Sequence, residues 1–120
     1  MVVRRMRIII DYKLDNWNNV ISHNRANKYV GASYKKKEMG IVKLFLSNVP
    51  KIEKYPIRLN CIWHTTNLGS DLDNKCLKAV LDAMQEVGIL KNDNIKHIPE
   101  INHKAVKDLK DFLVIEVEEL

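Results

Sequence analysis

Three aspartates between residues 69 and 93 have the types and spacing that could bind a metal ion. Asp71 and Asp73 are two residues apart, and Gly69 and Ser70 before them disfavour a helix. We therefore expect the pair in extended chain, with both carboxylates on one side. Asp93 follows the next helix, in a polar loop that could fold back over the start of that helix. Carboxylates gathered in this way need a proton or a cation among them, and their hard oxygens suit Mg²⁺, Mn²⁺ or Ca²⁺.

An amphipathic helix is predicted directly after the aspartate pair, with Asp73 or Asn74 at its N-cap. We expect it to end at Gly88. Lys75 and Lys78 lie on another face, where a lysine can bind a phosphate oxygen or stabilise charge in a transition state. Taken singly, an Asp-x-Asp-Asn before a helix is more typical of a capping turn, and an Asn-Asp-Asn is more typical of a loop. The apolar stripe of the helix has members three and four residues apart: Leu77, Val80, Leu81, Met84 and Val87.

Together, these features resemble the RusA-type Holliday junction resolvases, which are small homodimeric Mg²⁺-dependent endonucleases of phage and prophage origin. The resemblance is carried by Asp-Leu-Asp-Asn at residues 71–74, by the lysine-containing helix with Asp82-Ala83 near its centre, and by the aspartate in the following loop. It spans nearly the whole chain. It implies that Asp71, Asp73 and Asp93 are the catalytic, metal-binding carboxylates, with Mg²⁺ (or Mn²⁺) as the cofactor. It also implies a homodimer that cuts four-way DNA junctions.

The catalytic lysine and two rival functions stay open at this point. In the family the helix lysine usually stands where this chain has Leu77, so Lys78 is the choice and Lys75 the alternative. The family's loop often has two acids, whereas this chain has Asn92 before Asp93. One rival function is therefore a branched-DNA-binding module with a vestigial metal site. The other is a structural or regulatory protein in which the acids only cap a helix.

The overall charge favours a polyanionic partner. The 120 residues predict a single domain over 1–120, and they have a formal net charge of +5 with lysine and arginine concentrated in the first 60 residues. Composition alone fits either a solvated connector or a phosphate contact for the segment His-Asn-Arg-Ala-Asn-Lys-Tyr at 23–29. The resemblance favours DNA contact there, through Arg25 and Lys28, with Lys75 as a further DNA contact. The two cysteines predict no disulfide framework, and the four histidines lack zinc-site spacing.

The remaining pattern predicts the elements that position these residues. Without a signal peptide or membrane-spanning run, the chain is expected to be cytoplasmic. Strands are predicted at 4–12, 57–64, 95–98 and 112–118, and a further helix at 33–47. Residues 15–29 are predicted as a loop with a helical turn near 17–21, and 103–111 as a loop or short helix. The expected fold is α/β (α+β), with a small mixed sheet of about four strands and two main helices packed on it.

Overall fold

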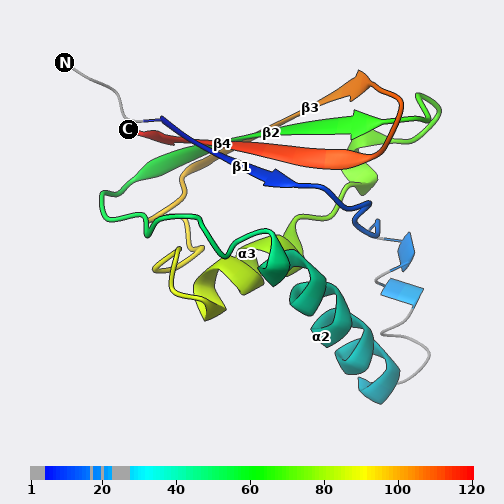
Figure 1. Cartoon of the computed structure of the whole chain (residues 1–120), viewed down its shortest axis with the longest axis horizontal. Coiled ribbons are helices and arrows are strands. Elements are labelled where there is room, and N and C mark those ends of the chain that lie inside the picture. The colour runs from blue at the N-terminus through cyan, green and yellow to red at the C-terminus, as the bar shows by residue number, and fades with distance from the viewer. Residues whose placement is uncertain (1–4, 17, 20, 23–27) are drawn as a thin grey trace.

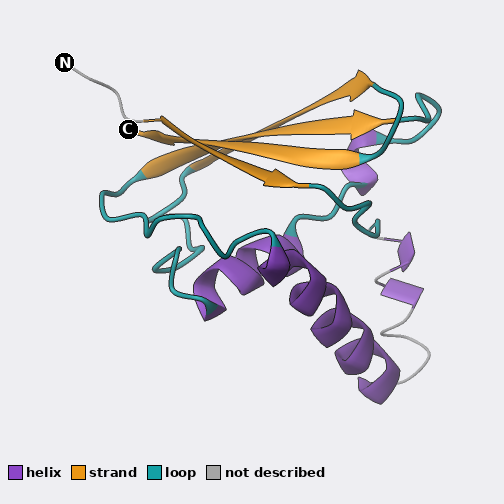
Figure 2. Cartoon of the chain, in the orientation of Figure 1, coloured by secondary structure: helices purple, strands orange, loops and turns teal. Residues whose placement is uncertain are grey.

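In the part of the chain that the structure describes, a four-stranded sheet carries the helices α2 and α3 on one of its faces (Figures 1 and 2). The computed structural model describes residues 5–16, 18, 19, 21, 22 and 28–120. The elements are β1 (Arg5–Ile10), α2 (Lys28–Leu44), β2 (Ile57–Thr65), the 3-10 turn η1 (Leu72–Asn74), α3 (Lys78–Glu86), β3 (Glu100–Lys107) and β4 (Phe112–Glu119). This architecture confirms the predicted mixed α and β fold.

The sheet mixes parallel and antiparallel pairs in the order β1-β4-β2-β3. β4 pairs antiparallel with both β1 and β2, so Ile115 faces Ile8 on one side and Cys61 on the other. β2 and β3 are parallel, with Asn60 beside Asn102. The strands β1 and β3 therefore form the two borders of the sheet, and η1 follows the end of β2.

The strict alternation of buried and half-buried residues in β2 explains how the sheet packs against the helices. Every second residue from Ile57 to Thr65 is buried, and these residues face α3 and the end of α2. In α3 the stripe of Val80, Ala83 and Met84 is fully buried against them. Each large aliphatic side chain removed from water in this way contributes about 1.5–3 kcal/mol to stability. The first half of α2 projects from the body of the protein (Figure 1).

Two predicted segments are corrected by the structure. Residues 95–98, predicted as a strand, form a turn in which Ile95 is 83% exposed. The segment 103–111 is predicted as a loop or short helix, but its residues 103–107 belong to β3. β3 is exposed along most of its length, so it lacks the apolar alternation that identified β2. In addition, α2 begins at Lys28 rather than at Ser33, and it ends at Leu44.

Two glycines give a matched test of the backbone of this fold. Gly88 ends α3 with a φ of 84°, and a Cβ there would meet nothing within 4 Å. A Gly88→Ala variant is expected to lose about 1–2 kcal/mol of unfolding free energy, because the left-handed backbone conformation is unfavourable for alanine. No steric contact adds to this cost. Gly40, inside α2, has equally open surroundings. Gly40→Ala is expected to gain about 0.5–1 kcal/mol, since alanine is the better helix former. Urea unfolding measures both changes, and shifts of the same sign would contradict this account.

Candidate metal centre

The predicted aspartate pair lies on η1, just beyond the end of β2. Asp71 is the N-cap of the turn, with φ −85° and ψ 131°, and Asp73 lies within it. Both residues are exposed, and neither side chain makes a hydrogen bond or ion pair with the described part of the chain. They are therefore open to a ligand from solvent.

The predicted extended conformation is confirmed for Asp71 and corrected for Asp73, which lies in the turn. The N–H of Asn74 donates to the carbonyl of Asp71 at 3.2 Å, and that of Lys75 donates to the carbonyl of Leu72 at 3.1 Å. These bonds curl the chain into a short turn before it extends again at Lys75. Neither Asp73 nor Asn74 caps α3, whose N-cap is Leu77.

Contacts with distant segments hold η1 in place. Asn16 forms an isolated bridge with Lys75, and the N–H of Asn18 donates to Oδ1 of Asn74 at 3.1 Å. η1 also contacts β3, and Cys76 and Leu77 after it are buried. The turn is thereby fixed between the segment that follows β1 and the end of the β2–β3 pair.

The two candidate lysines flank η1 but have different neighbours. Nζ of Lys75 lies 6.0 Å from the ring centroid of Trp63, in range for a cation–π contact. Nζ of Lys78 is 4.0 Å from Oδ2 of Asp82, while Lys35 lies 2.7 Å from the same oxygen. Lys35 is thus the principal partner of Asp82. Lys78, whose side chain is 53% exposed, is free to reach a phosphate.

Asp93 lies at the other end of the sheet from the pair. Its loop is fixed near the start of β2, where the N–H of Ile57 donates to the carbonyl of His97 at 2.9 Å. Since η1 follows the far end of β2, the nine residues of that strand separate the two segments by roughly 26 Å. Figure 1 shows them at opposite ends of the protein. Among the described residues, no three acids, histidines or cysteines lie close enough together to hold a metal ion.

The predicted DNA contacts are only partly described. Arg25 lies outside the described residues, and Lys28 is placed as the first residue of α2, with its side chain outside the description. Farther along the projecting half of α2, Lys36 and Lys37 are exposed. The projecting end of α2 therefore continues the basic surface that composition predicts.

Glu38 is a residue near this site that motif reasoning missed. It is only 6% exposed, and its Oε1 accepts a hydrogen bond from the N–H of Asp15 at 2.8 Å. Asp15 precedes Asn16, which bridges η1, so Glu38 positions the segment that supports the aspartate pair. Its spacing from Val42 and Leu46 puts it on the inner stripe of α2, and that spacing is the signal that could have identified it.

The burial of Glu38 predicts a specific pH dependence. Burial, with the Asp15 carboxylate as a smaller cause, raises the pKa of Glu38, although the N–H of Asp15 partly opposes the rise. The folded protein therefore holds this proton to higher pH than the unfolded chain does, and this contribution to stability falls as pH rises through the raised pKa. Glu38→Gln keeps the acceptor oxygen without the charge. It should be more stable than wild type at pH 7, and a difference that does not shrink at pH 4 in urea unfolding would contradict this.

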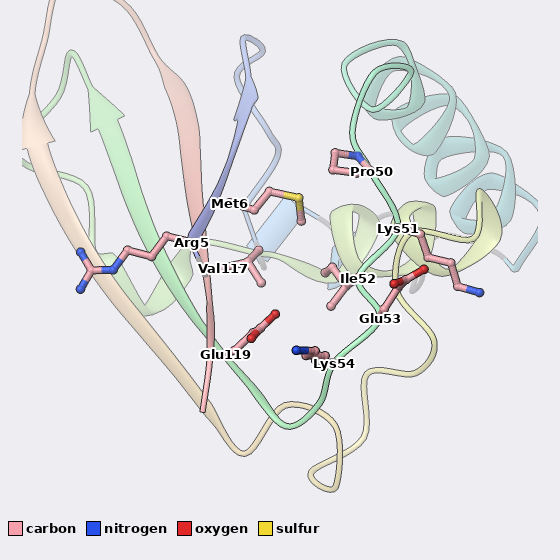
Figure 3. Close-up of a pocket in the computed structure, with 9 residues that line it drawn as sticks. All are labelled: Arg5, Met6, Pro50, Lys51, Ile52, Glu53, Lys54, Val117 and Glu119. Atoms are coloured by element: carbon pink, nitrogen blue, oxygen red, sulfur yellow. The ribbon is translucent and has the colours of Figure 1, made fainter. Parts of the chain in front are cut away.

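The cysteines and a pocket beside residues 50–54 add no chemistry to this centre. Both cysteines are free and buried, and burial raises the pKa of Cys61 to about 12, so its thiol stays protonated. A pocket of about 360 Å³ lies between residues 50–54 and the border of β1 and β4. Met6, Ile52 and Val117 point into it, and Lys54 and Glu119 lie at its rim (Figure 3). It lies near the start of β2, remote from η1, and holds none of the predicted site residues.

No protein-family model matches the chain, and no curated protein matches it. No helix in the described ranges is both long enough and apolar enough to cross a bilayer. The resolvase resemblance therefore stays a prediction from the sequence.

Proposed function

We propose that the chain is a Mg²⁺-dependent endonuclease that nicks branched DNA, with four-way junctions as its substrate, and that it resolves them as a homodimer. The observation that carries the proposal is the exposed Asp71 and Asp73 pair, which has no protein partner among the described residues. The pair follows directly from the central sheet and is flanked by Lys75 and Lys78. This combination of hard oxygen ligands and cations suits a metal ion beside a phosphate.

The residues present fit a divalent cation, because carboxylates open to solvent are the ligands that Mg²⁺ prefers. Asp71 and Asp73 would hold the ion together with an Asp93 carboxylate. A Mg²⁺ ion held there would lower the pKa of a bound water and polarise a phosphate oxygen. Lys78 stabilises the negative charge that builds up on the scissile phosphate, and Lys75, Lys28 and Arg25 hold the DNA backbone.

The distance to Asp93 defines how the homodimer must be built. Because one chain separates Asp93 from the pair by about the length of β2, the third carboxylate comes from the partner's Asp93 in this proposal. A two-fold dimer then has two equal sites, each shared between copies. Two sites suit a junction in which two related strands are cut.

The test uses purified wild-type protein with a labelled four-way junction and a linear duplex of the same sequence. We expect Mg²⁺-dependent nicks in the junction, no nicks with EDTA, and little cutting of the duplex. Junction binding without nicks in Mg²⁺ or Mn²⁺ would instead support a branched-DNA-binding module with a vestigial site, which Asn92 and the remote Asp93 favour. A melting temperature insensitive to these ions, without binding, would support a structural protein.

A further inference from the structure

β3 is a border strand whose outer side is open. It pairs with β2 on one side, and no described residue pairs with it on the other. Six of its eight residues are exposed, and Figure 2 shows it at the border of the sheet, away from α2 and α3. It contains no proline. A strand of this length with free N–H and C=O groups is a template for a further strand.

We propose that a second copy of this chain binds here, by antiparallel pairing of β3 with the partner's β3. A two-fold axis perpendicular to the sheet relates the two copies so that equivalent side chains point to the same side of the joined sheet. Two residues that pair directly across the interface must therefore point to the same side. Glu100, Asn102 and Lys104 share the face that the helices leave uncovered, because they lie beside Arg58, Asn60 and Ile62 of β2.

Charge selects one register of this pairing. With Asn102 on the axis, Glu100 faces the partner's Lys104 on both sides of the axis. With Lys104 on the axis, two lysines would face each other directly, which is unfavourable. With His103 on the axis, Glu100 would face the partner's Val106. Of these three registers, only the Asn102 register places opposite charges across the interface, where the partner's Lys104 would join the ion pair that Glu100 already forms with Arg58.

The same pairing brings together the two parts of the candidate metal centre, and this step rests on the proposed function. η1 contacts β3 and lies at the end of the sheet where β2 finishes (Figure 1), whereas the Asp93 loop precedes the start of β3. Antiparallel pairing places the start of one β3 beside the end of the other. In the Asn102 register the partner's His97 is level with Lys107, so the partner's Asp93 loop approaches η1. Pairing through β1, on the opposite border, would leave both segments away from the interface.

Sedimentation equilibrium of the full chain tests the interface. We expect a dimer that Lys104→Glu weakens at least about 10-fold, because two attractive pairs become repulsive. The double variant Glu100→Lys/Lys104→Glu should recover only part of the affinity, because Glu100→Lys also removes the ion pair with Arg58. Lys36→Glu makes the same charge change at an exposed position on α2 and should leave the dimer unchanged.

Disulfide trapping tests the register. Directly facing residues of an antiparallel pair have Cα atoms about 4.5–5.5 Å apart, within disulfide range. Asn102→Cys should therefore form a cross-linked dimer on mild oxidation, whereas Lys104→Cys, exposed on the same face, should not. The native cysteines are buried and do not interfere.

A monomer at all concentrations would overturn the interface, as would a dimer that is insensitive to Lys104→Glu and untrapped by Asn102→Cys. The proposed endonuclease function and the proposed β3 interface can fail independently. If the protein nicks junctions but does not dimerise through β3, the interface is wrong and the function stands. If the protein dimerises through β3 but never nicks junctions, the interface stands and the endonuclease function is wrong.

Discussion

An Asp73→Asn variant is expected to nick four-way junctions at least about 100-fold more slowly than wild type in Mg²⁺, since losing even an outer partner of a metal ligand costs 10–100-fold. Asparagine has nearly the same shape as aspartate but lacks the anionic oxygen that binds a hard cation. The Asp73 side chain makes no hydrogen bond or ion pair with the described residues, so its replacement should leave η1 and the fold intact. Junction affinity measured without metal should therefore be unchanged.

The matched control is Glu53→Gln, which makes the same kind of change at an exposed position near the start of β2, remote from η1. It should nick at the wild-type rate. Both variants should show the wild-type urea midpoint. If Asp73→Asn nicks junctions as fast as the control, Asp73 is no metal ligand and the proposed mechanism is wrong.

The strand predicted most accurately is the one whose two faces differ most strongly in polarity. Residues 57–64 alternate between apolar and polar, and the structure extends this strand only to Thr65. The β3 sequence around Asn102, His103 and Lys104 has no such contrast, because a border strand beyond the helices buries neither face. β3 forms through backbone hydrogen bonds to β2, and backbone hydrogen bonds produce no polar and apolar pattern in the sequence.

The candidate site was predictable in its position after β2 but not in its local shape. Whether Asp71 and Asp73 are extended or curled is decided by weak backbone bonds such as that from Asn74 to Asp71, at 3.2 Å. The separation of Asp93 has a simpler cause. A nine-residue helix advances the chain by about 13 Å, so α3 carries the sequence away from the pair before Asp93 is reached. A loop that follows the helix can return to the pair only through a further reversal, and the loop before β3 instead lies near the start of β2.

Mixing two inactive variants distinguishes a shared site from one within a single chain. Asp73→Asn and Asp93→Asn homodimers should each fail to nick, because every site lacks one ligand. In a heterodimer with shared sites, one site carries both substitutions and the other carries neither. Random pairing of equal amounts makes half of the dimers mixed, so about a quarter of all sites should be intact.

The expected result is that co-refolding the two variants restores about a quarter of the wild-type nicking rate, whereas each variant alone stays inactive. The products should be single nicks rather than paired cuts, since a heterodimer has only one working site. If Asp71, Asp73 and Asp93 of the same chain formed the site, every site in the mixture would still carry one substitution and no activity would return. An inactive mixture in which heterodimers are verified by co-purification, through an affinity tag carried by only one of the variants, would therefore reject the shared site, even if the wild-type protein nicks junctions.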